Sequence, residues 1–138
     1  MARTIFITEE DLFELREMIE RARIDRNGDG PYLTNLQSEL TRAQIVPAED
    51  IPRDVITMNS KVVMYDLDTR EQELFTLVYP WYADADNNRI SVLAPVGTAM
   101  IGCRVGDVIK WPVPAGIRRF RIEELIYQPE REGVLSSQ

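Results

Sequence analysis

The stretch Leu93-Ala94-Pro95-Val96-Gly97-Thr98-Ala99-Met100-Ile101-Gly102 decides how the rest of the chain is interpreted. A proline near its start and a glycine at its end predict one or two helical turns. The residues just before it, 89–93, alternate in polarity as a strand does. The stretch therefore predicts a strand-to-helix corner. Residues 95–97 at such a corner would be partly exposed and rigid, which suits a docking loop.

Further β-prone runs lie on both sides of this corner. They occupy residues 62–65, 73–80, 107–111 and 118–127. Short connections between them predict a largely antiparallel sheet, and the helices expected upstream make the fold class α+β. We assign residues 48–138 to this β-rich domain, which carries one short helix.

The N-terminal residues 1–47 predict a short antiparallel helical hairpin. Thr8 and Asp11 resemble a capping box at the start of the first helix. Apolar residues then recur at spacings of three, four and three, as in a coiled-coil seam, in two series: Leu12, Leu15, Ile19, Ala22 and Leu33, Leu36, Leu40, Ala43. Each helix has about 16 residues and is therefore roughly 24 Å long. Helices this short are marginal alone, so we expect the hairpin to lean on the β-rich domain.

Composition excludes several classes of function. The chain has no histidine and a single cysteine, Cys103, which removes His-based catalysis and intramolecular disulfides. Cys103 lies in an apolar stretch, and we interpret it as a buried small residue. The net charge of −7 argues against non-specific DNA binding and favours a basic partner surface. With no apolar run long enough to span a membrane and no signal peptide, we expect a cytoplasmic protein that does not bind membranes.

The motif that most resembles a metal-binding site is Asp25-x-Asn27-x-Asp29-Gly30, at the tip of the expected hairpin. This pattern matches the opening of an EF-hand loop, but the twelfth position, where a bidentate Glu is needed, is Leu36. We interpret it as a polar turn and leave weak divalent binding open. Acid pairs at 9–11, 49–50, 66/68 and 84/86 fit capping and turn roles, and Arg118, Arg119 and Arg121 fit a solvated face. We therefore expect no metal site, no cofactor and no catalytic residue.

Residues 93–102, followed by Arg104-Val105-Gly106-Asp107, resemble the C-terminal domain of bacterial Gre transcription factors, which usually read Ser-Pro-Ile/Val-Gly-x-Ala-Leu-Leu and then Gly-Asp. Two further stretches are similar to the Rnk branch, called regulator of nucleoside diphosphate kinase. They are Asp54-Val55-Ile56-Thr57-Met58-Asn59-Ser60 and Thr76-Leu77-Val78-Tyr79-Pro80. Residues 36–44 also look like that branch, so the resemblance spans roughly residues 33–130.

The resemblance implies an FKBP-like sheet domain and binding near the secondary channel of RNA polymerase. It places the contact with a coiled coil at the channel rim on Ala94, Pro95, Val96 and Gly97. Ala94 stands where Gre factors usually carry Ser, so any contact from that hydroxyl is missing. Nucleic acid would be reached only through the polymerase, and we expect a monomer.

Gre factors, which this chain resembles, reach into the channel with a long hairpin whose acidic tip holds a catalytic magnesium for transcript cleavage. The hairpin here is too short for that, so we expect a non-enzymatic regulator that binds without stimulating cleavage and competes with Gre factors. Two alternatives stay open. One is a regulator of the level or activity of nucleoside diphosphate kinase. The other is a magnesium-dependent cleavage factor that uses Asp25 and Asp29.

Overall fold

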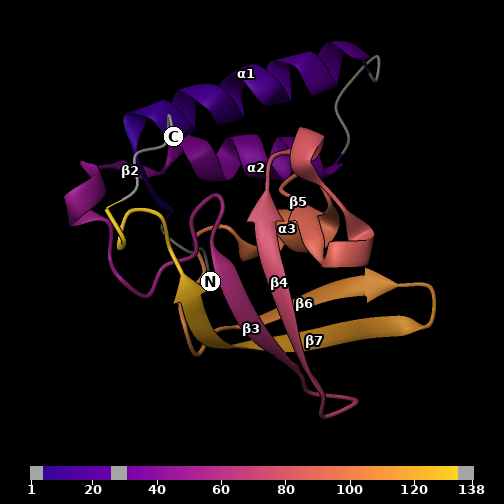
Figure 1. Cartoon of the computed structure of the whole chain (residues 1–138). Coiled ribbons are helices and arrows are strands. Elements are labelled where there is room, and N and C mark those ends of the chain that lie inside the picture. Colours follow the sequence, from indigo (N-terminus) through magenta and orange to yellow (C-terminus); the bar gives the residue numbers. More distant parts are fainter. Residues whose placement is uncertain (1–4, 26–30, 134–138) are drawn as a thin grey trace.

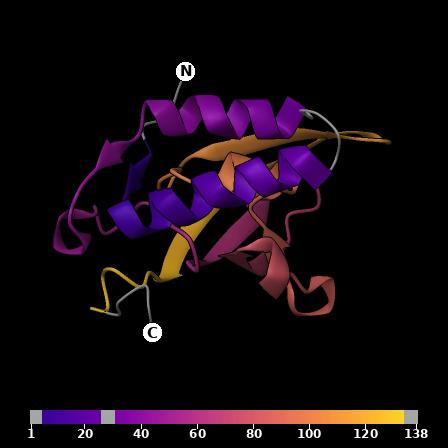
Figure 2. The same ribbon diagram turned by 90° about the horizontal axis from the view of Figure 1, so that it is seen from above.

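Two helices and a pair of very short strands form the N-terminal part of the computed structural model, which describes residues 5–25 and 31–133 (Figure 1). Their order is β1 (Phe6–Ile7), α1 (Glu9–Asp25), α2 (Pro31–Thr41) and β2 (Gln44–Ile45). Viewed from above, α1 and α2 lie side by side (Figure 2). A side-chain hydrogen bond from Arg23 on α1 to Gln37 on α2 links them. The predicted hairpin is therefore present.

The start of α1 follows local capping chemistry. The Thr8 hydroxyl accepts a hydrogen bond from the backbone N–H of Asp11 at 3.3 Å. Glu9, Glu10 and Asp11 occupy the first turn, where negative charge is favourable. The capping box is only half formed, because the Asp11 carboxylate points to another element.

The second helix is shorter than the sequence predicted, so the expectation of two equal helices is wrong. α2 has 11 residues against 17 in α1. It ends because the chain after Thr41 becomes extended and pairs in parallel with β1. Gln44 N donates to Ile5 O at 2.8 Å, and Val46 N donates to Ile7 O at 3.0 Å. Backbone pairing with the N-terminal strand takes the place of further helix.

Five strands form one curled sheet with the order β5-β4-β3-β7-β6. Their bounds are β3 (Lys61–Asp66), β4 (Gln72–Val78), β5 (Arg89–Ser91), β6 (Val108–Val113) and β7 (Gly116–Tyr127). All neighbours are antiparallel except β4 and β5, which are parallel. The predicted α+β class, with five strands and a short helix before the fourth, is confirmed. The short helices are η1 (Ala48–Asp50), η2 (Pro80–Tyr82), η3 (Ala85–Asn87) and α3 (Pro95–Met100).

An irregularity in β7 explains the imperfect alternation of its sequence. The register of β7 with β3 shifts twice, and one extra β7 residue is inserted each time. Met64 pairs with Ile122 but Val63 with Glu124, and Val62 pairs with Leu125 but Lys61 with Tyr127. The β-bulge opposite Val63 and Met64 moves the buried positions from even-numbered Phe120 and Ile122 to odd-numbered Leu125. Strand β6 lies at the sheet edge, where Pro112 can be tolerated within a strand.

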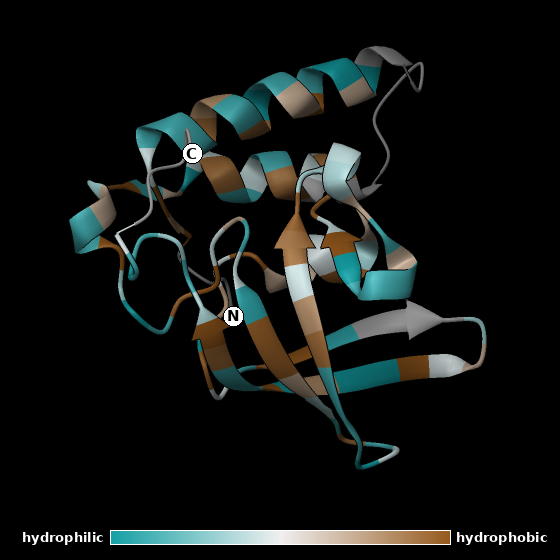
Figure 3. Cartoon of the chain, viewed as in Figure 1, coloured by the Kyte–Doolittle hydropathy of each residue, from teal (hydrophilic) through white to brown (hydrophobic). Residues whose placement is uncertain are grey.

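The hairpin and the sheet share one hydrophobic core, which confirms that the hairpin leans on the β-rich part. Leu15 and Leu36 are fully buried in the same cluster as Val62, Leu77 and Phe120 of the sheet. Figure 3 shows hydrophobic residues on α2 and along β3 and β4. Within residues 5–25 and 31–133, no helix combines the length and apolar character that crossing a membrane requires.

One buried polar contact joins α1 to the sheet domain. The Tyr79 hydroxyl donates to the Asp11 carboxylate at 3.1 Å, and both residues are buried. Burial raises the pKa of Asp11 to about 6, with further increases from Glu130 and Glu10, while the Tyr79 hydrogen bond lowers it. Burial and the neighbouring Asp11 charge also raise the pKa of Tyr79.

We predict that Asp11→Asn becomes more stable relative to the wild type as pH rises. The unfolded chain releases the Asp11 proton near 3.8, whereas the folded protein holds it to about 6, so ionisation destabilises the fold between these values. Two pKa units correspond to at most about 3 kcal/mol. Asparagine keeps the acceptor for Tyr79 but carries no charge. Urea unfolding of both proteins at pH 4 and pH 7 should show a relative gain of about 1–3 kcal/mol for the variant.

Asp50→Asn, which changes an exposed carboxylate on η1, is the matched control and should show no such gain. Parallel stability profiles of the wild type and Asp11→Asn between pH 4 and pH 7 would contradict the prediction.

Candidate docking site

The corner between β5 and α3 is built mainly from backbone hydrogen bonds. Ser91 closes the turn, because its carbonyl accepts from Ala94 N and its hydroxyl accepts from Leu93 N, both at 3.0 Å. Ala94 is the N-cap of α3, and Pro95 occupies the first turn of the helix, where its missing N–H is not needed. Ala94 supplies no side-chain capping bond. The corner is therefore ordered without any ionic contact.

Two residues of α3 fix the helix against the strand. A Cβ atom on Gly97 would lie 2.0 Å from the Ser91 carbonyl oxygen, so only glycine allows this approach. The Thr98 hydroxyl donates to Val92 O at 2.7 Å, and Thr98 N donates to Ala94 O at 2.8 Å. The backbone conformation of residues 94–97 is thus set by contacts on its inner side.

The exposure of the four corner residues differs from the sequence expectation. Pro95 is exposed, Ala94 and Val96 are half-buried, and Gly97 is buried. Val96 packs against the hydrophobic core. The expectation of partly exposed residues 95–97 is therefore wrong for Gly97. Pro95 is the most accessible point, with Ala94 and Val96 beside it.

Most of the expected hairpin-tip residues fall outside the described part of the chain. Asn27 and Asp29 lie outside the described residues, and only the backbone of Asp25 is described. The interpretation of this segment as a polar turn stays a prediction. Among the described residues, no three Asp, Glu or Cys side chains gather closely enough to hold a metal ion.

Asp66 shows the local role expected for the acid pairs. It is buried at the end of β3 and accepts hydrogen bonds from Asp68 N at 2.8 Å and Thr69 N at 3.1 Å. Arg118 donates to its other oxygen at 2.7 Å. This hydrogen bond from Arg118, followed by those from the turn, lowers the pKa of Asp66 to about 2. The turn after β3 is thus held by its own carboxylate.

The basic stretch of β7 is engaged locally. Besides the Arg118 contact, Arg119 pairs with Asp68 at 2.7 Å, and Arg121 pairs with Glu123. These side chains remain partly exposed, which fits the predicted solvated face better than a phosphate site. Cys103 is buried, as predicted, and its thiol donates to Ala99 O at 3.1 Å.

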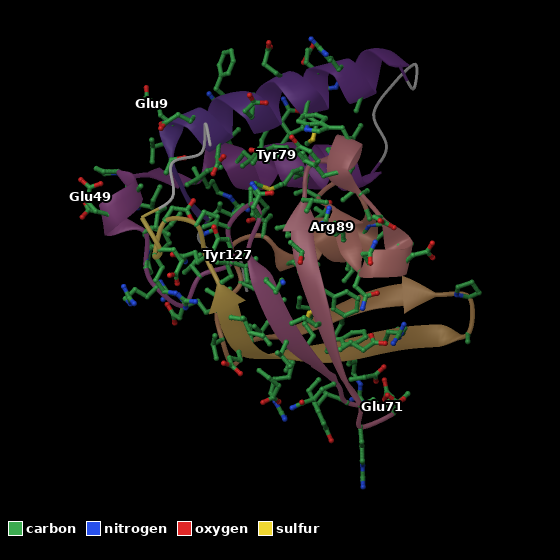
Figure 4. All side chains as sticks on the ribbon, viewed as in Figure 1. Glu9, Glu49, Glu71, Tyr79, Arg89 and Tyr127 are labelled. Carbon is green, nitrogen blue, oxygen red and sulfur yellow. The ribbon has the colours of Figure 1, made fainter. Side chains whose placement is uncertain are left out.

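The sequence did not predict a groove of about 1380 Å³, which lies on the face of β4 that points away from the hydrophobic core. Leu74, Thr76 and Val78 of β4 line it, whereas Phe75 and Leu77 between them belong to or pack against the core. We call it the aromatic groove and define it by Phe13, Leu74, Tyr79, Trp81, Tyr82 and Ile126. Figure 4 places Tyr79 beneath α1, and Arg89 of β5 lies nearby. The pair Trp81-Tyr82 after Pro80 was the one available signal.

Comparison with known proteins matches both parts of the chain. The model described as transcription elongation factor GreA/GreB, C-terminal, matches residues 51–127, and the model of the Rnk N-terminus matches residues 3–46. The regulator of nucleoside diphosphate kinase of Escherichia coli K12 is 45% identical over 104 residues, which cover 75% of this chain and 76% of that protein.

GreA of Thermoanaerobacter pseudethanolicus is 37% identical over 93 residues, which cover 67% of this chain but only 59% of that factor. A solved structure from Nitrosomonas europaea, described as a prokaryotic transcription elongation factor GreA/GreB, superimposes with a TM-score of 0.79. It has 39% sequence identity and covers 90% of this chain and 100% of that one. The chain therefore belongs to the GreA/GreB transcription elongation factor family and carries an N-terminal region of the Rnk type.

Proposed function

We propose that this regulator binds RNA polymerase near its secondary channel through the corner at residues 94–97, with Pro95 as its exposed contact, and does so without stimulating transcript cleavage. That the chain is a regulator related to transcription factors follows from its family. The observation that carries the proposed polymerase contact is the geometry of the corner. It presents an exposed proline on a backbone that inner contacts already hold in place.

A rigid corner suits protein docking because little conformational entropy is lost when it binds. The proline ring is apolar and has no rotatable side chain, so its burial against a partner brings hydrophobic stabilisation at low cost. The half-buried Val96 and Ala94 would extend this contact. The FKBP-like description of the sheet and the coiled-coil description of the hairpin remain predictions from the resemblance.

The placement of the hairpin supports binding without cleavage. At 1.5 Å per residue, α1 is about 26 Å long and α2 about 17 Å. The large seam residues of both helices are buried in the core shared with the sheet: Leu12, Leu15, Ile19, Leu33, Leu36 and Leu40. Asp11 is in addition hydrogen-bonded to Tyr79. A hairpin held in this way is not a free rod that extends into a channel. We therefore propose that the protein occupies the rim and competes there with Gre factors.

A second candidate function comes from the Escherichia coli relative, which is named as a regulator of nucleoside diphosphate kinase. Direct action would require that the purified chain changes the activity of the purified kinase. An effect seen only on kinase levels in cells would instead fit a transcriptional route. The two measurements therefore separate this candidate from the polymerase proposal.

We predict that Pro95→Glu weakens binding to core RNA polymerase at least tenfold, because a charge replaces an apolar surface at the point of contact. Glutamate is favourable in a first helical turn, so the fold should survive. Binding can be measured by pull-down and by anisotropy of a labelled protein, with circular dichroism to check folding. Pro114→Glu makes the same change at an exposed proline in the turn between β6 and β7, and should bind normally. Equal binding of the two variants would exclude the corner as the contact.

We predict that Ala94→Ser strengthens both the fold and the interaction. A serine at the N-cap can accept a hydrogen bond from a free N–H of α3, which typically contributes about 0.5–2 kcal/mol. The same hydroxyl would restore the residue usual in Gre factors. Thermal unfolding and the polymerase affinity are the two measurements. A gain in stability without any gain in affinity would show that the partner does not contact this hydroxyl.

We predict no increase in transcript cleavage when the intact protein is added to stalled elongation complexes with magnesium. A Gre factor serves as the positive control, and excess of the intact protein should suppress its effect, whereas Pro95→Glu should not. Robust cleavage that is lost in Asp29→Ala would overturn this proposal and favour the cleavage-factor alternative.

A further inference from the structure

We propose that the aromatic groove binds a protein segment that presents an arginine between apolar side chains. This surface lies on the sheet face opposite α3 and is distinct from the corner at residues 94–97. The proposal goes beyond the polymerase contact and does not depend on it.

The aromatic wall of the groove is pre-organised. The rings of Tyr79 and Trp81 are stacked, with centroids 5.2 Å apart and an angle of 2° between their planes. Tyr82 meets Trp81 edge-on at 6.3 Å. Tyr79 is buried and hydrogen-bonded to Asp11, whereas Trp81 is 59% exposed. One face of the indole is therefore covered by a fixed ring, and much of the rest is available to a ligand.

The groove carries a negative local field beside this wall. Glu10, Asp11 and Glu14 of α1 line it together with Glu132. Their effect reaches the aromatic wall, because Asp11 and Glu14 both raise the pKa of Tyr79, after burial as the largest cause. The positive residues that line the groove are Lys61 and Arg89. Acids thus outnumber bases, in line with the net charge of −7 for the whole chain.

Apolar side chains surround the charged positions. Leu74 on β4 is 42% exposed, Ile126 on β7 is 43% exposed, and Phe13 on α1 is 65% exposed. Exposed large apolar residues that line one groove are more informative than scattered ones. They provide contacts for the apolar residues of a partner segment.

Arginine is the cation that fits this combination best. Its planar guanidinium can stack on the open face of an indole and also donate two parallel hydrogen bonds to a carboxylate such as Glu14. Lysine offers a point charge without the planar stacking. A nucleic acid could stack bases on Trp81, but its phosphates would meet the acidic side chains of α1. Charge complementarity therefore selects a basic, partly apolar protein segment.

The test uses the intact chain and fluorescein-labelled synthetic peptides in which leucine alternates with arginine, lysine or glutamate. Anisotropy at 50 mM salt should show saturable binding of the arginine peptide, at least threefold weaker binding of the lysine peptide and no binding of the glutamate peptide. Trp81→Ala and Glu14→Gln, both at exposed positions, should each weaken arginine-peptide binding at least fivefold. Weaker binding at 300 mM salt would further support the charge contribution.

Matched controls remove a carboxylate charge and an exposed apolar side chain elsewhere on the surface. Glu71→Gln alters a carboxylate at the far end of the sheet from Tyr79 (Figure 4), and Ile117→Ala removes an exposed apolar side chain of β7 outside the groove. Both should bind the arginine peptide within twofold of the wild type. Pro95→Glu should also bind it normally, which separates this proposal from the polymerase contact.

Absence of saturable binding of the arginine peptide, or equal effects of the groove and control variants, would overturn the proposal. Comparable binding of a labelled single-stranded oligonucleotide would also overturn it, because stacking alone would then explain the groove.

Discussion

The apolar faces of α1 and α2 have to be buried against something other than each other. An 11-residue helix paired with a 17-residue helix cannot form a stable hairpin alone, because short helices in water depend on tertiary packing. The sheet supplies that packing, and residues of both parts meet in one core. The position of the hairpin is thus a requirement of its stability. The parallel pairing of β1 and β2 closes the hairpin at its base and fixes where α2 ends.

This constraint explains why an acidic residue lies in the interior. Asp11 occupies the first turn of α1, where negative charge favours the helix, but packing of that turn against the sheet domain buries it. Its carboxylate finds a partner in the Tyr79 hydroxyl, and the same contact holds the Tyr79 ring in place. Because Tyr79 stacks on Trp81, the orientation of an exposed aromatic surface depends on a hydrogen bond made by the hairpin. Packing of the hairpin and the shape of the aromatic groove are therefore linked.

The sequence predicted those features that arise from local patterns. The 3-4-3 spacing from Leu12 onward, the turn residues around Asp84 and the Pro95-to-Gly102 stretch each indicated an element that the structure contains. Features that depend on distant parts of the chain were missed. No local sequence pattern indicates that residues 44–45 pair with residues 6–7. The sequence therefore predicted a longer α2 than the structure contains. The two extra residues in β7 are likewise set by its register with β3.

The two candidate sites differ in the same way, because one depends on local sequence and the other on distant parts of the chain. The corner could be predicted because its proline and glycine act within a few residues, although the burial of Gly97 depends on the carbonyl of Ser91. The groove could not be predicted, because it brings together α1, β4, η2 and the end of β7 from positions more than 100 residues apart. The sequence assigned Asp11 a capping role in an acidic first turn, and only the tertiary fold shows that its side chain is buried.

The apolar seam of a helical hairpin cannot both pair the two helices along a projecting rod and pack the hairpin against the sheet. A long hairpin that projects from its domain has to satisfy its seam by pairing helix against helix along its whole length. In this chain Leu15, Ile19 and Leu36 are buried where hairpin and sheet meet, so the seam is used to hold the two parts together. The N-terminal region therefore forms one wall of the aromatic groove and does not project from the domain as a rod.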